Sequence, residues 1–185
     1  MLGRFGADGT IFRIFVIGFI PQSSESAFDE VLKMKFKNPM FVVADMDKTV
    51  AFYKKVLGLH VILDFGANKT LTGGLCLQTL ETWKTFIGTD EIAFGGNNAE
   101  IYFEEDDFDA FAEKLKKFDM EYVHPVKEHS WGQRAVRFYD PDKHIVEVGE
   151  NMKIVCKRFL DSGMTPEQVA ERMDVPMTFV NACMR

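Results

Sequence analysis

The chain contains the same succession of predicted elements twice, and this duplication most limits the folds it can adopt. Residues 39–65 read as a short apolar strand, an amphipathic helix that stops at Gly58, and a second strand. Residues 98–128 repeat this order of strand, helix and strand. Each copy continues into a predicted hairpin, at 69–79 and at 133–149. The offset of roughly sixty residues marks a duplicated βαβββ unit, and we therefore expect an α+β fold of two similar modules.

Both predicted helices begin at closely spaced aspartates and carry an apolar stripe. Asp45 and Asp47 stand at the start of the first helix, and Asp106 and Asp107 at the start of the second. Carboxylates at these positions interact favourably with the helix N-terminus. Apolar residues recur at helical spacing in both segments, which predicts one helix face packed on a sheet. They are Val50, Phe52, Tyr53, Val56 and Leu57 in the first helix and Phe108, Phe111, Ala112, Leu115 and Phe118 in the second.

A tight turn at Asp140-Pro141-Asp142 separates two runs of strand-forming residues in the second hairpin. Proline presets φ for a turn, and the two aspartates can accept hydrogen bonds from nearby backbone N–H groups. In the second run Val146 and Val148 face one way and Glu147 faces the other. Glu147 either lies in water at a sheet edge, or is buried and then needs a partner, a metal ion or a proton.

These motifs resemble those of the vicinal oxygen chelate superfamily, which includes glyoxalase I, extradiol dioxygenases and the bleomycin and fosfomycin resistance proteins. The resemblance covers residues 35–150 and is carried by two stretches, 43–59 and 138–142, with Glu147 after the second. It implies paired βαβββ modules whose curved sheets form a cup. It does not identify the reaction, because one fold hosts many chemistries.

The resemblance divides the chain into three parts. Residues 1–33 form an N-terminal extension, residues 34–150 a glyoxalase/bleomycin-resistance-like domain, and residues 151–185 a helical tail. Within the domain the two modules occupy about 34–80 and 98–150. Because Met34 would start the family domain directly at its first strand, we expect the extension to be non-native or disordered. A hydrophobic anchor is the alternative.

The resemblance places four polar residues at inward-facing strand positions around the cup. They are Asn38, Gln78, Glu100 and Glu147. Metal-using relatives commonly place histidine at one or two of these positions, and this chain has none there. An oxygen-only set suits a hard ion such as Mg²⁺ or Mn²⁺ better than Zn²⁺ or iron. We expect either one divalent ion (Mg²⁺, Mn²⁺ or Ni²⁺) or a metal-free cup in which these residues bind each other, water or a ligand.

A second group of residues is expected at the mouth of the cup, in a segment that resembles the pocket-bordering loop of the family. His129, Trp131 and Arg134 lie in or beside this segment, and Arg137 should point into the cup, whereas Arg134 shares the opposite face with Phe138. An arginine here could bind a ligand carboxylate or phosphate. The candidate substrate contacts are Arg137, Trp131, His129, Arg134 and Tyr102. The alternative is ordinary surface contact around a packed tryptophan.

The residues expected around the cup allow two classes of function. In an enzyme, a glyoxalase-like isomerase or lyase and less readily a dioxygenase, a metal ion would polarise adjacent substrate oxygens. Glu100 or Glu147 would then act as a base or ligate the ion. In a binding protein, the same cup would sequester a small molecule without a metal, as the bleomycin resistance proteins do.

Charge, hydrophobicity and cysteine content limit the kinds of partner that the chain can have. The net charge of −6 gives a nucleic acid no electrostatic attraction. The apolar run 11–20 is too short to span a membrane, and three scattered cysteines without a CxxC motif favour a reducing cytoplasm. We expect a small-molecule partner and, as one option, a homodimer.

The tail itself predicts helices at 152–162, capped by Gly163, at 167–173 and from there to Arg185. Thr165 and Pro166 are typical of a helix start. The pattern also resembles the start of a helix-turn-helix motif, so DNA binding is one reading. Few basic residues lie beyond residue 150, which favours packing or dimerisation.

Overall fold

The computed structural model describes residues 34–185, and the expected N-terminal extension, residues 1–33, lies outside them. Residues 38–185 form one compact unit that contains the helices and strands of both predicted modules and of the tail. Among residues 34–185, no helix has the length and hydrophobicity needed to cross a membrane.

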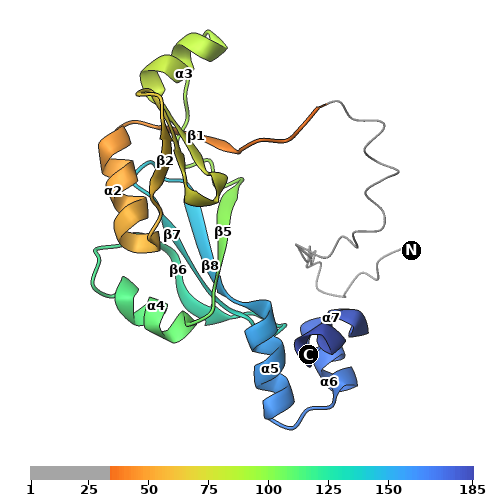
Figure 1. Ribbon diagram of the computed structural model, residues 1–185. Helices are drawn as coiled ribbons and strands as arrows, with labels where there is room; N and C mark the ends of the chain where they lie inside the picture. Colours follow the sequence, from red (N-terminus) through yellow and green to blue (C-terminus); the bar gives the residue numbers. More distant parts are fainter. Residues whose placement is uncertain (1–33) are drawn as a thin grey trace. The chain divides into compact units, whose positions relative to one another are not determined.

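The first module consists of β1 (Met40–Val43), α2 (Met46–Leu57), β2 (Val61–Asp64), β3 (Asn68–Leu71) and β4 (Cys76–Thr79). Its four strands lie in the order β1-β4-β3-β2. Strand β1 runs parallel to β4, and the other neighbours are antiparallel. Figure 1 shows α2 lying along this sheet. The α2 crossover starts β2 in the same direction as β1, and the two antiparallel reversals that follow bring β4 beside β1 as a parallel partner.

The second module consists of β5 (Glu100–Glu105), α4 (Phe108–Leu115), β6 (Tyr122–Glu128), β7 (Arg134–Tyr139) and β8 (Ile145–Glu150). Its strand order, β5-β8-β7-β6, is that of the first module, with β5 parallel to β8. The predicted duplication and the α+β class are therefore confirmed. One helix between the modules, α3 (Leu80–Ile87), was not predicted.

The helix boundaries follow the predicted caps. Asp45 accepts a hydrogen bond from the backbone N–H of Lys48 at 3.0 Å, and Asp107 accepts one from Ala110 at 3.1 Å. Gly58 ends α2 with a φ of 73°, a conformation that glycine adopts without steric cost. The apolar helix faces can then pack against the sheets.

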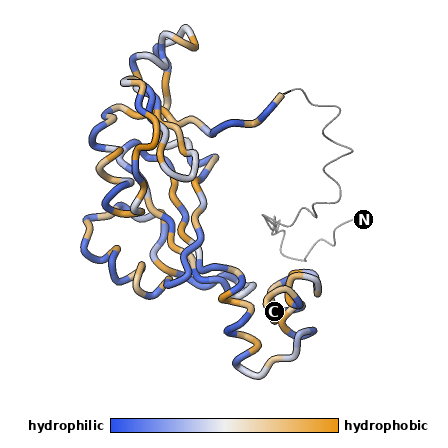
Figure 2. Tube along the Cα trace, in the orientation of Figure 1, coloured by the Kyte–Doolittle hydropathy of each residue, from blue (hydrophilic) through white to orange (hydrophobic). Residues whose placement is uncertain are grey.

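One hydrophobic core lies under both modules. Strand alternation directs one face of each sheet into it, and Figure 2 shows the resulting mixture of hydrophobic and hydrophilic segments along the chain. Its fully or nearly buried members include Val43, Tyr53, Val56, Leu71 and Leu77 from the first module and Phe108, Leu115, Val136, Phe138 and Val146 from the second. Because both modules contribute, the two sheets are held together by apolar packing.

The Asp140-Pro141-Asp142 turn joins the modules, a role beyond the predicted local one. As expected, Asp140 accepts hydrogen bonds from the backbone N–H groups of Asp142 (2.9 Å) and His144 (2.8 Å). Asp140 also accepts the hydroxyl of Tyr53 on α2. Asp142 accepts the backbone N–H of Ala44 at 2.8 Å and the Thr49 hydroxyl at 2.7 Å. The turn therefore binds α2 at Thr49 and Tyr53 and the backbone just before the helix at Ala44.

The tail forms a three-helix unit, called the C-terminal unit below, of α5 (Met152–Asp161), α6 (Pro166–Met173) and α7 (Met177–Cys183). It has an apolar cluster of its own, formed by Val155, Cys156, Val169, Met173, Val180 and Cys183. Thr165 and Gln168 form a capping box at the start of α6, as the sequence predicts. Helix α5 ends one residue before the predicted boundary, with Ser162 as its cap.

Candidate functional site

Two of the predicted inward-facing carboxylates meet on the polar face of the second sheet, around an arginine. Arg137 on β7 stands directly opposite Glu147 on β8 in the strand register. Its Nε donates to Glu100 Oε2 on β5 at 2.8 Å, and its Nη2 pairs with Glu147. Glu147 is 4% exposed, so its negative charge needs this partner. Arg137 thus points where strand parity predicts.

His124 on β6 completes this group of four residues, called the Arg137 cluster below. Nε2 of His124 lies 3.1 Å from Arg137 Nη1, and its Nδ1 lies 2.8 Å from the carbonyl oxygen of Pro125. An arginine only donates and a carbonyl only accepts. In this geometry Nε2 accepts from Arg137 and Nδ1 donates to the Pro125 carbonyl.

Tyr102 and Gln133 extend the polar face along the strands. The side-chain amide of Gln133 donates to the Tyr102 hydroxyl at 2.9 Å and to the carbonyl of Glu150 at 2.8 Å. Gly149 lies beneath them, and a Cβ there would stand 2.7 Å from the Gln133 amide nitrogen. Burial raises the pKa of Tyr102 to about 12, so its hydroxyl keeps its proton and donates to Glu104 at 3.2 Å. No role was predicted for Gln133, although it shares strand parity with Arg137.

His129 and Trp131 form a flat stack at the loop between β6 and β7. Their ring centroids are 4.3 Å apart and the rings are 1° from parallel. Trp131 Nε1 donates to the side-chain oxygen of Gln133 at 3.1 Å, which ties the stack to the polar face. Nε2 of His129 is buried without a hydrogen-bond partner. Burial, together with the charges of Arg137 and Lys127, lowers the pKa of His129 to about 4, so the ring is neutral at neutral pH.

Arg134 is not part of this group, although it was a candidate substrate contact. Because side chains alternate along a strand, it lies on the opposite face of β7 from Arg137. Its guanidinium pairs with the buried Glu150 at 3.1 Å and with Asp109 at 2.7 Å, and it stacks 5.2 Å from the ring centroid of Phe108. Arg134 therefore fastens α4 to the sheet.

The two amide residues of the predicted set lie in the first module and have separate partners. Gln78 is buried; its Oε1 accepts from Asn68 at 2.9 Å, and its amide nitrogen contacts Thr82 on α3. Asn38 precedes β1 and donates to the carbonyl of Gly74 at 2.7 Å. Within residues 34–185, no hydrogen bond or ion pair joins either amide to Glu100 or Glu147.

The sequence matches the family model of the glyoxalase-like domain over residues 36–153. The chain belongs to the glyoxalase-like domain family. It is thereby a member of the vicinal oxygen chelate superfamily, as the sequence motifs predict. The matched range ends within α5, so the glyoxalase-like domain includes both modules and leaves most of the C-terminal unit outside it. Comparison with curated proteins gave no match.

Solved structures agree with this assignment. A protein of unknown function from Agrobacterium tumefaciens strain C58 is 35% identical, with a TM-score of 0.59 over 65% of this chain and 96% of that chain. A glyoxalase/bleomycin resistance protein/dioxygenase from Nocardioides is 19% identical, with a TM-score of 0.54 over 65% and 85%. Lactoylglutathione lyase from Agrobacterium tumefaciens is 23% identical, with a TM-score of 0.51 over 64% and 94%. The last two similarities concern the fold alone.

The side chains expected to hold a metal ion do not fit one in their present arrangement. The Arg137 guanidinium pairs with the carboxylates of both Glu100 and Glu147, and its positive charge would repel a divalent cation. The side-chain oxygen of Gln78 is already hydrogen-bonded to Asn68. No group of three or more His, Cys, Asp or Glu side chains in the described part of the chain could hold a metal ion.

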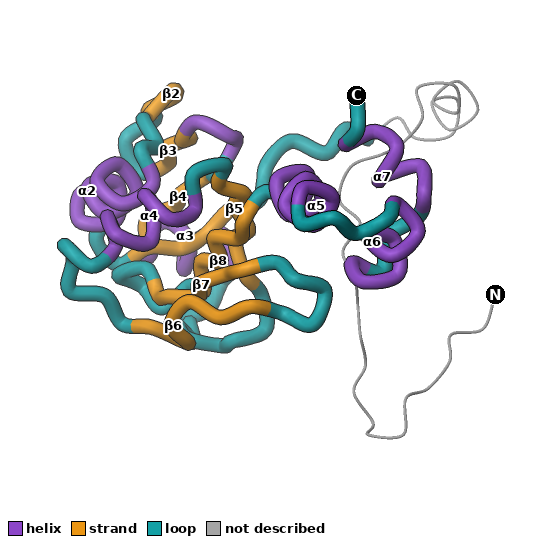
Figure 3. The backbone as a smooth tube through the Cα atoms, turned by 90° about the horizontal axis from the view of Figure 1, so that it is seen from below, coloured by secondary structure: helices purple, strands orange, loops and turns teal. Residues whose placement is uncertain are grey.

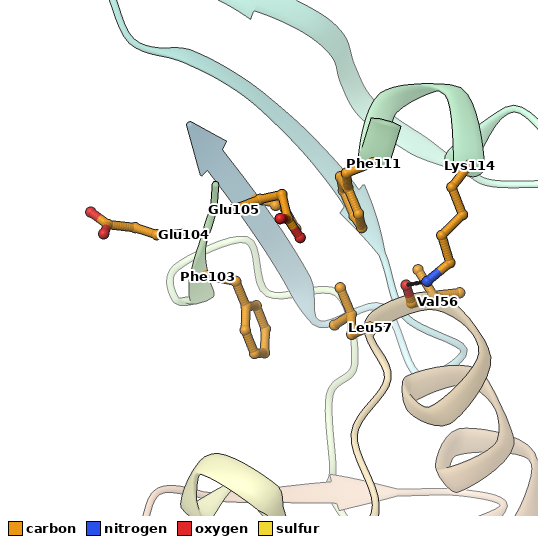
Figure 4. Close-up of a pocket in the computed structure, with 8 residues that line it drawn as sticks. Val56, Leu57, Phe103, Glu104, Glu105, Phe111 and Lys114 are labelled. Atoms are coloured by element: carbon orange, nitrogen blue, oxygen red, sulfur yellow. Dashed lines mark hydrogen bonds between the residues drawn. The ribbon is translucent and has the colours of Figure 1, made fainter. Parts of the chain in front are cut away.

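A cavity of about 120 Å³ lies on the other side of β5, between α2 and α4. Figure 4 shows Phe103 and Phe111 at this cavity and Glu104 pointing away from it. Lys114 donates to the carbonyl of Val56 at its edge, at 2.8 Å. The cavity belongs to the apolar face of the sheet, so it is separate from the polar face that carries the Arg137 cluster.

Proposed function

We propose that the polar face of the second sheet binds a small organic molecule that carries a positive charge, without a metal ion. The observation that carries this proposal is the pairing of Arg137 with both Glu100 and Glu147. A guanidinium shared by two carboxylates has little donor capacity left for an anionic ligand. We therefore assign the ligand contacts to the carboxylates and the aromatic rings, and a positioning role to Arg137.

The charge of this face supports the choice of ligand. Three carboxylates, those of Glu100, Glu104 and Glu147, stand against the guanidinium of Arg137 and the ammonium of Lys127, which leaves a formal charge of −1. The side chain of Glu100 is 36% exposed, so an ammonium or guanidinium group can reach it from solvent. The ring of Tyr102 lies beside these carboxylates and can add a cation–π contact.

Binding can be tested with three small probes of one shape and different charge: benzylammonium, benzyl alcohol and benzoate. In a Trp83→Phe background, Trp131 is the single tryptophan and reports on the face by fluorescence. We expect benzylammonium to bind, and rising salt to weaken it because exposed charges are screened. Glu100→Gln should weaken this binding about fivefold or more, for a lost charge contact of roughly 1 kcal/mol. Glu81→Gln, at an exposed position on α3 outside the second module, should leave it unchanged. Tighter binding of benzoate than of benzylammonium would overturn the proposal.

The alternative function is a glyoxalase-like isomerase or lyase that uses a divalent ion. It requires Arg137 to release both carboxylates, so it predicts metal affinity that depends on them. Calorimetric titration of the wild type and of Glu147→Gln with Mn²⁺ and Ni²⁺ separates the two functions. We expect no binding heat from either protein. Heat in the wild type that is lost in Glu147→Gln would favour the metal-dependent enzyme.

A further inference from the structure

The C-terminal unit contacts the loop that carries the His129–Trp131 stack. Nη2 of Arg158 on α5 donates to the carbonyl of Gly132 at 2.7 Å. The same guanidinium pairs at 3.1 Å with Glu150, which is 2% exposed. Figure 3 shows the chain between β6 and β7 extending toward this unit. Helix α5 therefore binds both the loop and the end of the central strand β8.

Gly132 is the loop residue against which Phe159 of the C-terminal unit packs closely. Its φ of +87° lies in the region that side chains rarely adopt, and a Cβ at this position would overlap the ring of Phe159. Two independent conditions thus require glycine here: the backbone conformation and the position of the Phe159 ring. The ring lies against the loop backbone at a place where no other residue type would fit.

Phe159 is held in place from two sides. The guanidinium of Arg158 lies 5.1 Å from its ring centroid, and that of Arg172 on α6 lies 5.3 Å from it. Arg172 also reaches Glu128, at the end of β6, at 3.4 Å. Arg172 and Arg158 thus connect the C-terminal unit to the two sides of the loop.

The loop transmits these contacts to the stacked rings. The backbone N–H of Gly132 donates to the carbonyl of His129, and the N–H of His129 donates to the carbonyl of Gln133, both at 2.8 Å. Trp131 is fixed through the Gln133 side chain. A shift of Gly132 therefore moves the backbone that carries both rings.

We propose that the C-terminal unit supports the ligand-binding face: Phe159 and Arg158 are positioning residues that hold His129 and Trp131 beside the Arg137 cluster. This inference rests on the proposed function only for what the polar face binds. The contacts by which Phe159 and Arg158 hold the loop are part of the fold and do not depend on a ligand. It gives the tail a role other than DNA binding, and it does not require a second copy of the chain.

The test uses the full-length protein with Phe159→Ala, and with Phe179→Ala as the matched control. Phe179 packs in the apolar cluster of the same unit, so its loss should loosen the helices without removing a ring from Gly132. Two readouts follow the loop itself: the pKa of the His129 imidazole by NMR, assigned with His129→Gln, and the emission of Trp131 in the Trp83→Phe background.

In Phe159→Ala we expect the His129 pKa to rise by about one unit or more toward 6.5, because the ring becomes hydrated. Emission of Trp131 should shift to longer wavelength. Arg158→Met, which removes the hydrogen bond to Gly132 but keeps an apolar stem, should act in the same direction and provides the test if Phe159→Ala fails to fold. Phe179→Ala should change neither readout.

Unchanged readouts in folded Phe159→Ala and Arg158→Met, or equal changes in Phe179→Ala, would overturn the inference. Benzylammonium binding separates the two proposals. If the spectra of Phe159→Ala change and the wild type does not bind benzylammonium, the proposed function fails and the support of the loop stands. If the wild type binds and the spectra of Phe159→Ala do not change, the support fails.

Discussion

The hydroxyl of Tyr53 donates to Asp140 Oδ2 over 3.0 Å and thereby connects helix α2 of the first module to the β7–β8 turn of the second. Asp142, two residues further along the turn, binds Thr49 of the same helix and the backbone N–H of Ala44 just before it. Both aspartates are almost fully buried. The turn is therefore a clamp between the modules, and it can be tested apart from the ligand site.

Asp142→Ala should destabilise the folded protein by about 3 kcal/mol, because it leaves the part-buried Ala44 N–H and the buried Thr49 hydroxyl without their charged acceptor. Urea unfolding followed by circular dichroism measures the change. Asp119→Ala, at an exposed position after α4, should change the free energy of unfolding by less than about 0.5 kcal/mol. Equal changes in the free energy of unfolding for the two substitutions would show that the clamp does not stabilise the fold.

Tyr53→Phe should change how stability depends on alkaline pH. Burial, followed by the charge of Asp140, raises the pKa of Tyr53 well above 10.0. Above pH 10 the folded protein keeps a proton that the unfolded chain releases. The contribution of Tyr53 to the free energy of unfolding is therefore fully present below pH 10 and is lost as pH rises above it. The free energy of unfolding, measured from neutral to strongly alkaline pH, should fall less steeply in Tyr53→Phe. At neutral pH the substitution should cost about 1 kcal/mol for the lost hydrogen bond.

Glu150→Gln should destabilise the protein at neutral pH and lose its effect in acid. Burial alone would raise the pKa of Glu150, but the hydrogen bond from Arg134 and the charge of Arg158 outweigh it and lower the pKa below 4.5. Its stabilising contribution is therefore complete above about pH 4.5 and is lost as pH falls through the lower, folded-state value. We expect a cost of about 3 kcal/mol near pH 7, measured by urea unfolding at several pH values.

The control for Glu150 is Glu113→Gln. Glu113 pairs with Lys116 on the surface of α4, where both side chains are 68% exposed. Such pairs contribute about 0.5 kcal/mol or less. A pH dependence that is the same in both variants would contradict the assignment of the acid-sensitive stability to Glu150.

Arg137→Met should leave Glu147 buried without its counter-charge. We expect a loss of about 3 kcal/mol, measured by thermal or urea unfolding. A double variant, Arg137→Met with Glu147→Leu, should recover most of this loss, because an apolar pair can replace a buried ion pair. If the double variant is no more stable than Arg137→Met, the charge of Glu147 is not the source of the cost.

Much of the fold could be predicted because it depends on local periodicity. Strand alternation alone placed Glu147 opposite Val146 and Val148, and Arg137 on the same side as Glu147. The helix caps at Asp45 and Thr165 could also be predicted, because each depends only on residues within one turn of the helix start. The duplicated order of elements then determined the topology of both sheets.

Other features depended on contacts between distant parts of the chain. Nothing near Glu150 in sequence indicates that Arg134 and Arg158 meet on it. Strand β1 begins at Met40 and not before it, in keeping with the missing N–H of Pro39, so Asn38, which was predicted at a strand position, lies outside β1. The expected cytoplasmic location and the homodimer stay predictions.

The clamp formed by the Asp140-Pro141-Asp142 turn has a consequence for folding kinetics. Its hydrogen bonds join residues that are 87, 93 and 98 positions apart in the sequence. Contacts of such high order form slowly, because a long chain segment must close before they provide any stabilisation. The two modules share one order of elements and strands, yet neither can complete the surroundings of α2 alone. We therefore expect them to fold and unfold together, in one cooperative transition whose rate is limited by the docking of one module on the other.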